Sequence, residues 1–194
     1  MIAIIKYNGG NVSSVQNALN RLDVDSVITD DFETIRNADK IIFPGVGEAS
    51  STMDLLRQKG LDKLIPTLQQ PVLGICLGMQ LMCGRNEEGN TFGMGIFDIE
   101  VKKFPSRDLV PHMGWNTFHN INSPLFAEIG TENDVYFVHS YYCELSAYTT
   151  SVCDYILPFS ASLQKDNFFA VQFHPEKSGS IGNKILTNFL KLNS

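Results

Sequence analysis

Long apolar runs are missing from this sequence of 194 residues. No stretch approaches the roughly 18 apolar residues that a membrane-spanning helix needs. The N-terminal run Ile2–Tyr7 is too short for the core of a signal peptide, and no basic region precedes it. We therefore expect a cytoplasmic protein that makes no contact with a membrane.

Positive charge is also scarce. The chain has 15 lysines and arginines against 21 aspartates and glutamates, and its formal net charge is -6. The basic residues are scattered, and Lys102-Lys103 is their densest pair, so the sequence lacks the basic stripe that nucleic-acid binding requires. We expect no nucleic-acid partner.

Cysteine and histidine occur without the spacing of a metal site. The sequence has neither the paired cysteines of a zinc knuckle nor a His-Glu-x-x-His run. A reducing compartment argues against a disulfide framework as well. We expect no metal, and we expect Cys83, Cys143 and Cys153 to be small apolar core residues, whereas Cys76 has to be judged by its neighbours.

Apolar strand patterns alternate with helical patterns in the first half of the chain. The expected strands are Ile2–Tyr7, Ser26–Ile28, Lys40–Phe43 and Val72–Ile75, and the expected helices are Val12–Leu22 with Asn11 as N-cap, Ser51–Lys59 and Leu77–Cys83. Strands separated by helices of this size indicate a parallel sheet with helices on both faces.

The second half is richer in strands. These are expected at Gly95–Phe104, Gly114–Phe118, Val135–Ser140, Thr149–Ile156, Ser160–Gln164 and Phe168–Phe173, before a closing helix at Ile181–Leu192. We predict an α/β fold with a mixed sheet that is parallel in the centre and has antiparallel additions. No linker or low-complexity segment divides the chain, so residues 1–194 are expected to form one domain.

Cys76 lies at the centre of Gly74-Ile75-Cys76-Leu77-Gly78, between an expected strand and an expected helix. Such a sharp turn holds a nucleophile in a strained conformation above the sheet, and flanking glycines relieve the crowding. The N-terminus of the helix favours thiolate, which is the reactive form. A buried cysteine between two tightly packed glycines is the alternative, but the strand-to-helix position favours the nucleophile.

His174-Pro175-Glu176 follows the last expected strand. A cysteine nucleophile needs a base that takes its proton, and that base needs a third group that orients it. Residues two apart on an extended chain face the same side, so Glu176 can reach the ring of His174. A strand-end histidine beside a surface glutamate is the alternative. Together with Cys76, the pattern predicts a Cys76–His174–Glu176 triad.

The other histidines are weaker candidates for the base. His112 follows a proline in an expected turn, and His119 lies in a polar, loop-like stretch. His139 lies in an apolar strand, where we expect a hydrogen-bonded core residue. The order of a cysteine, a later histidine and a glutamate two residues on matches no thiol-protease signature.

Two further segments are candidates for a substrate pocket. Pro44-Gly45-Val46-Gly47 follows its strand at the edge where open α/β sheets bind ligands, and its glycines allow backbone N–H groups to face an oxyanion. Gln80 lies one helical turn after Cys76 and can face the same pocket. Glu88, in a polar loop, is suited to an amino-acid ammonium group. A plain turn and a solvated loop are the alternatives.

Together these motifs resemble the class I, or triad, glutamine amidotransferases, and more narrowly the glutaminase subunits of imidazole glycerol phosphate synthase. The similarity covers almost the whole chain and rests on P-G-V-G (44–47), G-I-C-L-G-M-Q-L (74–81), P-H-M-G-W-N (111–116), Y-F-V-H-S-Y (136–141) and Q-F-H-P-E-K-S (172–178). The cysteine and H-P-E motifs would match any class I amidotransferase, whereas P-H-M-G-W-N and H-P-E-K-S are more particular to this subunit.

The resemblance implies a flavodoxin-like α/β fold and a glutaminase that uses no cofactor. Cys76 would attack the glutamine carboxamide, and His174, held by Glu176, would protonate the departing ammonia and activate water. The backbone at Val46 and Gly47 would stabilise the oxyanion. The residues expected to contact glutamine are Gln80, Glu88, Ser140 and Tyr141.

The resemblance also implies a partner. Ammonia would pass to a cyclase subunit, a (β/α)8 barrel, in a heterodimer that makes imidazole glycerol phosphate for histidine biosynthesis. Asn11, Trp115 and Lys177 match positions that the family uses at this interface. An exposed tryptophan would serve as an interface anchor, and a core tryptophan is the alternative. The chain departs from many relatives at Glu48-Ala49-Ser50, where a bulkier aromatic residue is expected.

Two other functions stay open at this point. A paralogous amidotransferase subunit that feeds a sugar-modifying synthase would share most of these motifs. A standalone thiol hydrolase or chaperone-like protein on a flavodoxin-like sheet would lack a glutamine pocket and need no partner. A catalytically silent regulatory subunit is a third reading, which the intact triad disfavours.

Overall fold

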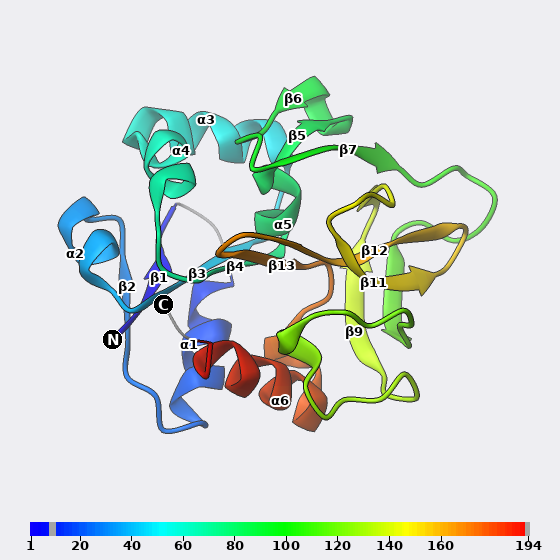
Figure 1. Ribbon diagram of the computed structural model, residues 1–194. Coiled ribbons are helices and arrows are strands. Elements are labelled where there is room, and N and C mark those ends of the chain that lie inside the picture. The colour runs from blue at the N-terminus through cyan, green and yellow to red at the C-terminus, as the bar shows by residue number, and fades with distance from the viewer. Residues whose placement is uncertain (8–10, 193–194) are drawn as a thin grey trace.

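The computed structural model describes residues 1–7 and 11–192, and its centre is a seven-stranded sheet (Figure 1). From one edge to the other the sheet contains β11 (Thr149–Asp154), β12 (Pro158–Lys165), β13 (Phe168–Val171), β4 (Val72–Cys76), β3 (Lys40–Gly45), β1 (Ile2–Ile5) and β2 (Ser26–Thr29). The strands from β13 to β2 are parallel, and β12 and β11 pair antiparallel. The predicted fold class is confirmed.

Helices cover both faces of this sheet. In Figure 1, α1 (Val12–Asn20) and α6 (Gly179–Leu190) lie below it, and α3 (Ala49–Lys59), α4 (Leu61–Leu64) and α5 (Leu77–Met82) lie above it. A further short helix, α2 (Phe32–Asn37), follows β2. None of the helices in the described part of the chain has the length and apolar character that crossing a bilayer demands.

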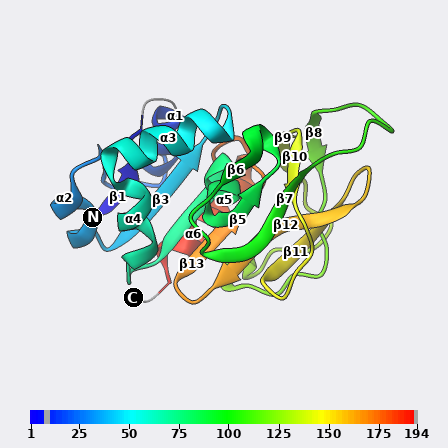
Figure 2. The same cartoon turned by 90° about the horizontal axis from the view of Figure 1, so that it is seen from above.

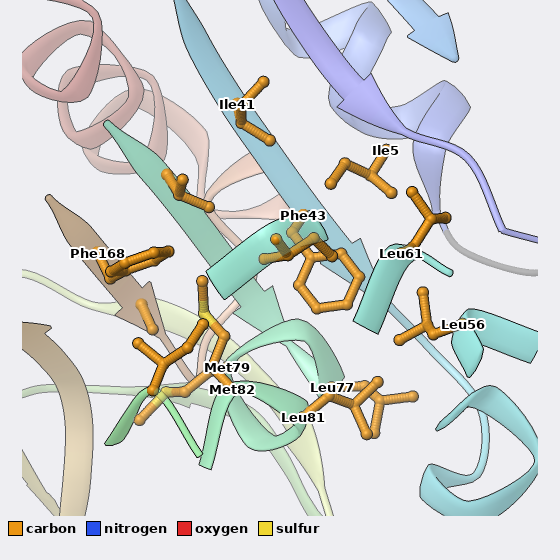
Figure 3. Close-up of a cluster of buried hydrophobic side chains, with 14 of the residues drawn as sticks. Ile5, Ile41, Phe43, Leu56, Leu61, Leu77, Met79, Leu81, Met82 and Phe168 are labelled. Carbon is orange, nitrogen blue, oxygen red and sulfur yellow. The ribbon is translucent and has the colours of Figure 1, made fainter. Parts of the chain in front are cut away.

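The central strands are apolar on both sides because both faces are covered. Ile4 of β1 and Ile42 of β3 belong to the core cluster that includes α1 and α6. Their neighbours Ile5 and Phe43 belong to the opposite cluster, where α3, α4 and α5 pack on the sheet (Figure 3). This alternation fixes the register of the strands, because a shift by one residue would exchange the two faces.

Two smaller sheets complete the fold. The first contains β10 (Tyr141–Cys143), β7 (Phe97–Lys103), β5 (Cys83–Asn86) and β6 (Thr91–Phe92), and the second pairs β8 (His112–Asn116) with β9 (Val135–His139). Short 3-10 helices are found at Ile65–Thr67, Glu88–Asn90, Pro124–Phe126 and Pro175–Lys177. In Figure 2, β8, β9 and β10 lie toward the β11 and β12 end of the molecule, away from α2.

Several predicted boundaries need correction. The helix expected to start at Ser51 starts at Ala49, because the Glu48 carboxylate accepts a hydrogen bond from the Ser51 amide and caps it. The strand expected from Gly114 starts at His112, so His112 is a buried strand residue and not part of a turn. The helices α2 and α4 and the strands β5, β6 and β10 were not predicted, since each is too short for a periodic pattern.

Candidate active site

Cys76 ends β4 and immediately precedes α5, in the sharp turn that the sequence predicted. Its φ of 53° is in the left-handed region, which a residue with a side chain rarely adopts. A Cβ on Gly78 would lie 2.0 Å from the carbonyl oxygen of Phe43, and one on Gly74 would lie 2.6 Å from Met82 Sδ. The close packing of the turn against β3 and α5 therefore explains why both of these positions are glycine.

Parallel pairing brings three distant segments to one edge of the sheet. Cys76 of β4 pairs with Gly45 of β3, so Val46 and Gly47 leave the sheet next to the sulfur. On the other side, Ile75 pairs with Val171 of β13, and the chain continues from there to Gln172 and His174. The carboxyl ends of parallel strands form the usual ligand-binding edge of such sheets.

The predicted triad residues are together at this edge. His174 Nδ1 lies 2.8 Å from Glu176 Oε1, and both side chains are almost completely buried. The other ring nitrogen, Nε2, makes no hydrogen bond of regular geometry within residues 1–7 and 11–192. His174 and Cys76 line the same cavity, so Nε2 is the ring atom left to exchange a proton with the sulfur.

Buried partners hold His174 and Glu176 in place. The Asn11 side chain donates to Glu176 Oε1 at 2.9 Å, and the Ser178 hydroxyl donates to the His174 carbonyl at 2.6 Å. Asn11 was expected to cap α1, but its side chain makes no capping hydrogen bond there. It instead reaches the carboxylate that orients the histidine.

The charges around His174 favour its protonated form. Burial acts to lower the pKa of His174, but the nearby Cys76 and the hydrogen bond and charge of Glu176 outweigh burial and raise it to about 10. The ring therefore carries a proton at neutral pH when the sulfur and the carboxylate are charged. A protonated ring beside the nucleophile can serve as the acid that a leaving amine requires.

The cavity has a volume of about 320 Å³, at the lower end of the range typical of ligand pockets. Both backbone positions expected at the oxyanion, Val46 and Gly47, line it. The residues expected to contact the substrate also line it, and these are Gln80, Glu88, Ser140 and Tyr141. The structure thus brings together residues that the sequence spreads over much of the chain.

Two of these pocket residues have partners inside the protein. Gln80 Nε2 donates to the Tyr141 carbonyl at 2.9 Å and to Gln172 Oε1 at 3.0 Å. Glu88 Oε2 accepts a hydrogen bond from the Ala49 amide at 2.8 Å. Burial raises the pKa of Glu88, and the nearby Glu48 adds to this, while the Ala49 amide opposes it.

Tyr7 fixes the segment that follows β3. Its hydroxyl donates to the Pro44 carbonyl at 2.6 Å. Burial raises the pKa of Tyr7, and the charge of Cys76 acts in the same direction, while the Val46 backbone opposes both. The hydroxyl therefore stays protonated and keeps its hydrogen bond. Gly47, which follows Val46, has a φ of 109°, which a residue with a side chain adopts only under strain.

The remaining cysteines differ from Cys76 in their surroundings. Cys83 and Cys143 are buried free cysteines, and their sulfur atoms lie 3.6 Å apart, within hydrogen-bonding distance but not joined in a disulfide. Burial, together with the charge of Asp154, raises the pKa of the Cys153 thiol to about 12. Of the four cysteines, Cys76 alone lines the cavity. In the described part of the chain, no group of three or more histidine, cysteine or acidic side chains is arranged to hold a metal ion.

The expected interface residues lie near one rim of the cavity. Trp115 is 56% exposed, so the alternative of a core tryptophan is wrong. Its ring packs against Tyr136 at a centroid distance of 5.9 Å, and Lys177 Nζ lies 6.0 Å from the Tyr136 ring centroid. Met113, two residues before Trp115 on β8, is exposed as well. We call Met113, Trp115, Tyr136 and Lys177 the rim patch.

Sequence reasoning missed Gln172, which is fully buried and lies 3.7 Å from the Cys76 sulfur through Nε2. The signal was present in the sequence. Gln172 is the only polar residue between Phe168 and Phe173, and it precedes His174 by two positions, on the same side of an extended chain. A lone buried polar side chain needs partners, and those of Gln172 are Gln80 and the nucleophile.

Known proteins resemble this chain over its full length. The family model for glutamine amidotransferase class-I matches residues 4–192. The imidazole glycerol phosphate synthase subunit HisH of Bacteroides fragilis is 57% identical, with 98% of this chain and 99% of the relative covered. The protein of the same name from Pasteurella multocida is 47% identical, with 98% and 97% covered. A crystal structure of a glutamine amidotransferase from Thermotoga maritima shares the fold, with a TM-score of 0.64 and 14% identity, over 97% of this chain and 81% of that one.

The charge of Glu176 is expected to set the protonation of His174. Glu176→Gln keeps an oxygen for the His174 and Asn11 hydrogen bonds but removes the negative charge that stabilises the protonated ring. The pKa of His174, about 10 in the unaltered protein, should therefore fall by about one unit or more. An NMR titration of the His174 ring measures it. The exposed Glu132→Gln is the control, and an unchanged His174 titration in Glu176→Gln would contradict the expectation.

Proposed function

The chain belongs to the class I glutamine amidotransferases and, within them, to the HisH subunits of imidazole glycerol phosphate synthase, and we propose that it supplies such a synthase with ammonia. In this function it hydrolyses glutamine to glutamate and ammonia as one amidotransferase domain spanning residues 1–194. A cyclase subunit then uses the ammonia to make imidazole glycerol phosphate in histidine biosynthesis. The observation that carries the proposal is the 57% identity to HisH over almost the full length of both chains.

Cys76 begins the reaction in this proposal. Its sulfur attacks the carboxamide carbon of glutamine, and the resulting oxyanion is stabilised by backbone N–H groups at Val46 and Gly47. Both positions line the cavity beside the sulfur. His174 then gives its Nε2 proton to the amine, so that ammonia leaves and a glutamyl thioester remains on Cys76. The protonated ring favoured by the site suits this step.

Water completes the cycle. After Nε2 of His174 has given its proton to the amine, it takes a proton from a water molecule. The oxygen of this water attacks the thioester, which releases glutamate. Glu176 accepts a hydrogen bond from Nδ1 at 2.8 Å, which keeps Nε2 as the atom that exchanges protons in both halves of the reaction. The Asn11 contact to Glu176 supports this orientation.

The substrate is held by the other residues of the cavity. Glu88 pairs with the α-ammonium group of glutamine, because it is an acidic residue that lines the same cavity as the nucleophile. Ser140 and Tyr141 contact the substrate from the segment after β9. Gln80 is adjacent, and since its N–H groups bind Tyr141 and Gln172, its oxygen is the atom available to the substrate.

A heterodimer with a (β/α)8-barrel cyclase is part of the proposal. The rim patch supports it, because an exposed tryptophan, a methionine and a lysine beside the cavity are suited to protein contact. Asn11, the third residue expected at the interface, donates a hydrogen bond to Glu176, next to Lys177 in the sequence. We also propose a cytoplasmic location, where Cys83 and Cys143, which are neighbours but form no disulfide, would stay reduced. The identity to HisH favours this partner over a sugar-modifying synthase.

Removing the nucleophile tests whether this chain hydrolyses glutamine while the cyclase subunit uses the ammonia. In the complex with the cyclase, Cys76→Ala should lower glutamine-dependent product formation by roughly 10⁴-fold or more, because both halves of the hydrolysis need the sulfur. Product formation from ammonium salts should stay within about twofold of the unaltered complex, since the cyclase chemistry is intact.

The control is Cys153→Ala, the same change at a buried cysteine outside the cavity. It should retain the glutamine reaction. Full glutamine-dependent activity of Cys76→Ala, or loss of the ammonium reaction in that variant, would overturn the proposal.

Truncating the tryptophan of the rim patch tests the partner interface. Trp115→Ala should weaken binding to the cyclase by about 10- to 100-fold, as expected for a buried aromatic anchor. Titration calorimetry with the purified cyclase gives the dissociation constant. The matched control is Phe92→Ala, because Phe92 is an aromatic residue with 64% exposure on β6, in a different sheet. Equal affinity of both variants would place the interface elsewhere.

A further inference from the structure

A buried row of hydrogen-bonded side chains, Gln80 and Gln172, leads to the sulfur of Cys76, and the reaction described above gives Gln172 no part. Gln80 Nε2 donates to the Tyr141 carbonyl at 2.9 Å and to Gln172 Oε1 at 3.0 Å. Gln172 Nε2 in turn lies 3.7 Å from Cys76 Sγ, with donor geometry toward the sulfur. Gln172 is 0% exposed and Gln80 is 4% exposed, so water does not compete for these contacts.

The orientation of the two side-chain amides follows from the Tyr141 carbonyl, the acceptor at the start of the row. A backbone carbonyl only accepts, so the amide nitrogen of Gln80 must face Tyr141. The second N–H of Gln80 then points at Gln172, which must present its oxygen. Gln172 is thereby left with its N–H groups toward Cys76. Reversing the Gln172 amide would bring two donors face to face and turn its oxygen toward the sulfur.

The Tyr141 carbonyl is itself held from the opposite side. His139 Nδ1 donates to it at 2.7 Å, which leaves His139 Nε2 to accept from His112 Nδ1 at 3.0 Å. Burial lowers the pKa of His139 to about 3 and that of His112 to about 4, so both rings are neutral and each keeps one tautomer at neutral pH. The Tyr141 carbonyl is therefore held in place as an acceptor, and the amide groups of Gln80 and Gln172 cannot easily exchange their donor and acceptor ends.

We propose that Gln172 is a further catalytic residue, whose Nε2–H group donates a hydrogen bond to the Cys76 sulfur and stabilises it as the attacking thiolate. The inference rests on the proposed function in taking Cys76 as the nucleophile. The sheet places Gln172 beside the sulfur. Val171, the last residue of β13, pairs with Ile75 of β4, and the next residues along the two chains are Gln172 and Cys76. A charged sulfur strengthens a hydrogen bond of this kind.

The two protonation states of Cys76 use different partners. The neutral thiol can donate its proton to the Val138 carbonyl, which lies 3.9 Å from the sulfur. The thiolate has no proton to donate and can only accept a hydrogen bond, and the Gln172 amide offers the donor. His174 lies in the same cavity and supplies the positive charge, so Gln172 adds a neutral donor that stays in place when His174 gives up its proton.

Alkylation of Cys76 by iodoacetamide across pH tests the proposal in the full-length chain. The rate follows the thiolate fraction, and mass spectrometry of the peptide that contains Cys76 separates it from the other cysteines. Gln172→Met keeps the length of the side chain and removes the donor. The midpoint of the profile should rise by about one pH unit, and alkylation at pH values below the midpoint should be about tenfold slower.

A second variant and a matched control complete the design. Gln172→Glu keeps the acceptor for Gln80 and replaces the donor by a carboxylate oxygen, so it should shift the midpoint further upward. Gln164→Met makes the same chemical change on the neighbouring strand β12, at a residue that does not line the cavity, and should leave the profile unchanged. The titratable groups around the sulfur are His174 and Tyr7, with Glu176 and His139 next to them and Glu88 and Lys177 in the cavity wall. They are the same in Gln172→Met and Gln164→Met, whereas Gln172→Glu adds one carboxyl group.

An unshifted profile in folded Gln172→Met would overturn the proposal. Should that variant fail to fold, as judged by its thermal transition, Gln172→Glu provides the same test, and an unshifted midpoint there would overturn it equally. Iodoacetamide requires neither glutamine nor a partner. A shifted profile in a protein whose complex with the cyclase lacks glutaminase activity would uphold the hydrogen bond from Gln172 to Cys76 and refute the proposed function. An unshifted profile in a protein whose complex is active would uphold the proposed function and refute the role of Gln172.

Discussion

The in-register parallel pairing of β4 with β3 and β13 is the constraint on which the rest of the structure depends. It sets Cys76 between the chain that leaves β3 at Val46 and the chain that leaves β13 toward His174. The apolar side chains on both faces of the sheet hold this register, since a one-residue shift would turn Phe43 from one core cluster to the other. The cavity is thus a consequence of the packing of the core.

Burial determines the chemistry available at this edge. A charged histidine inside a protein is unfavourable unless opposite charges and hydrogen bonds compensate it, and here Glu176 and Cys76 do so. Glu176 in turn accepts a hydrogen bond from Asn11, and Gln172 Nε2 lies 3.7 Å from the sulfur. The nucleophile therefore has a charged neighbour and a neutral one, and each of the two is fixed by its own partner.

The sequence allowed prediction of the features that follow from local spacing. The strand-to-helix turn at Cys76 and the contact between His174 and Glu176 were recognisable because each is encoded within a few residues. The expected extended backbone of His174-Pro175-Glu176 was wrong, because the chain turns into a 3-10 helix at Pro175–Lys177. Contacts between distant segments were not predictable in this way. The strand β10 is only three residues long, and the hydrogen bond of Gln172 to Cys76 exists only because two strands pair. His112 was misplaced because the proline before it indicated a turn, whereas pairing with β9 makes it a strand residue.

The most direct test of this account is covalent labelling by a diazoketone that mimics glutamine, followed by mass spectrometry of the whole chain. The account predicts that the label attaches to Cys76, that Cys83, Cys143 and Cys153 remain unmodified, and that added glutamine slows the reaction, because Cys76 alone of the four lines the cavity. Labelling of Cys76 no faster than that of the other three cysteines, or without protection by glutamine, would contradict it.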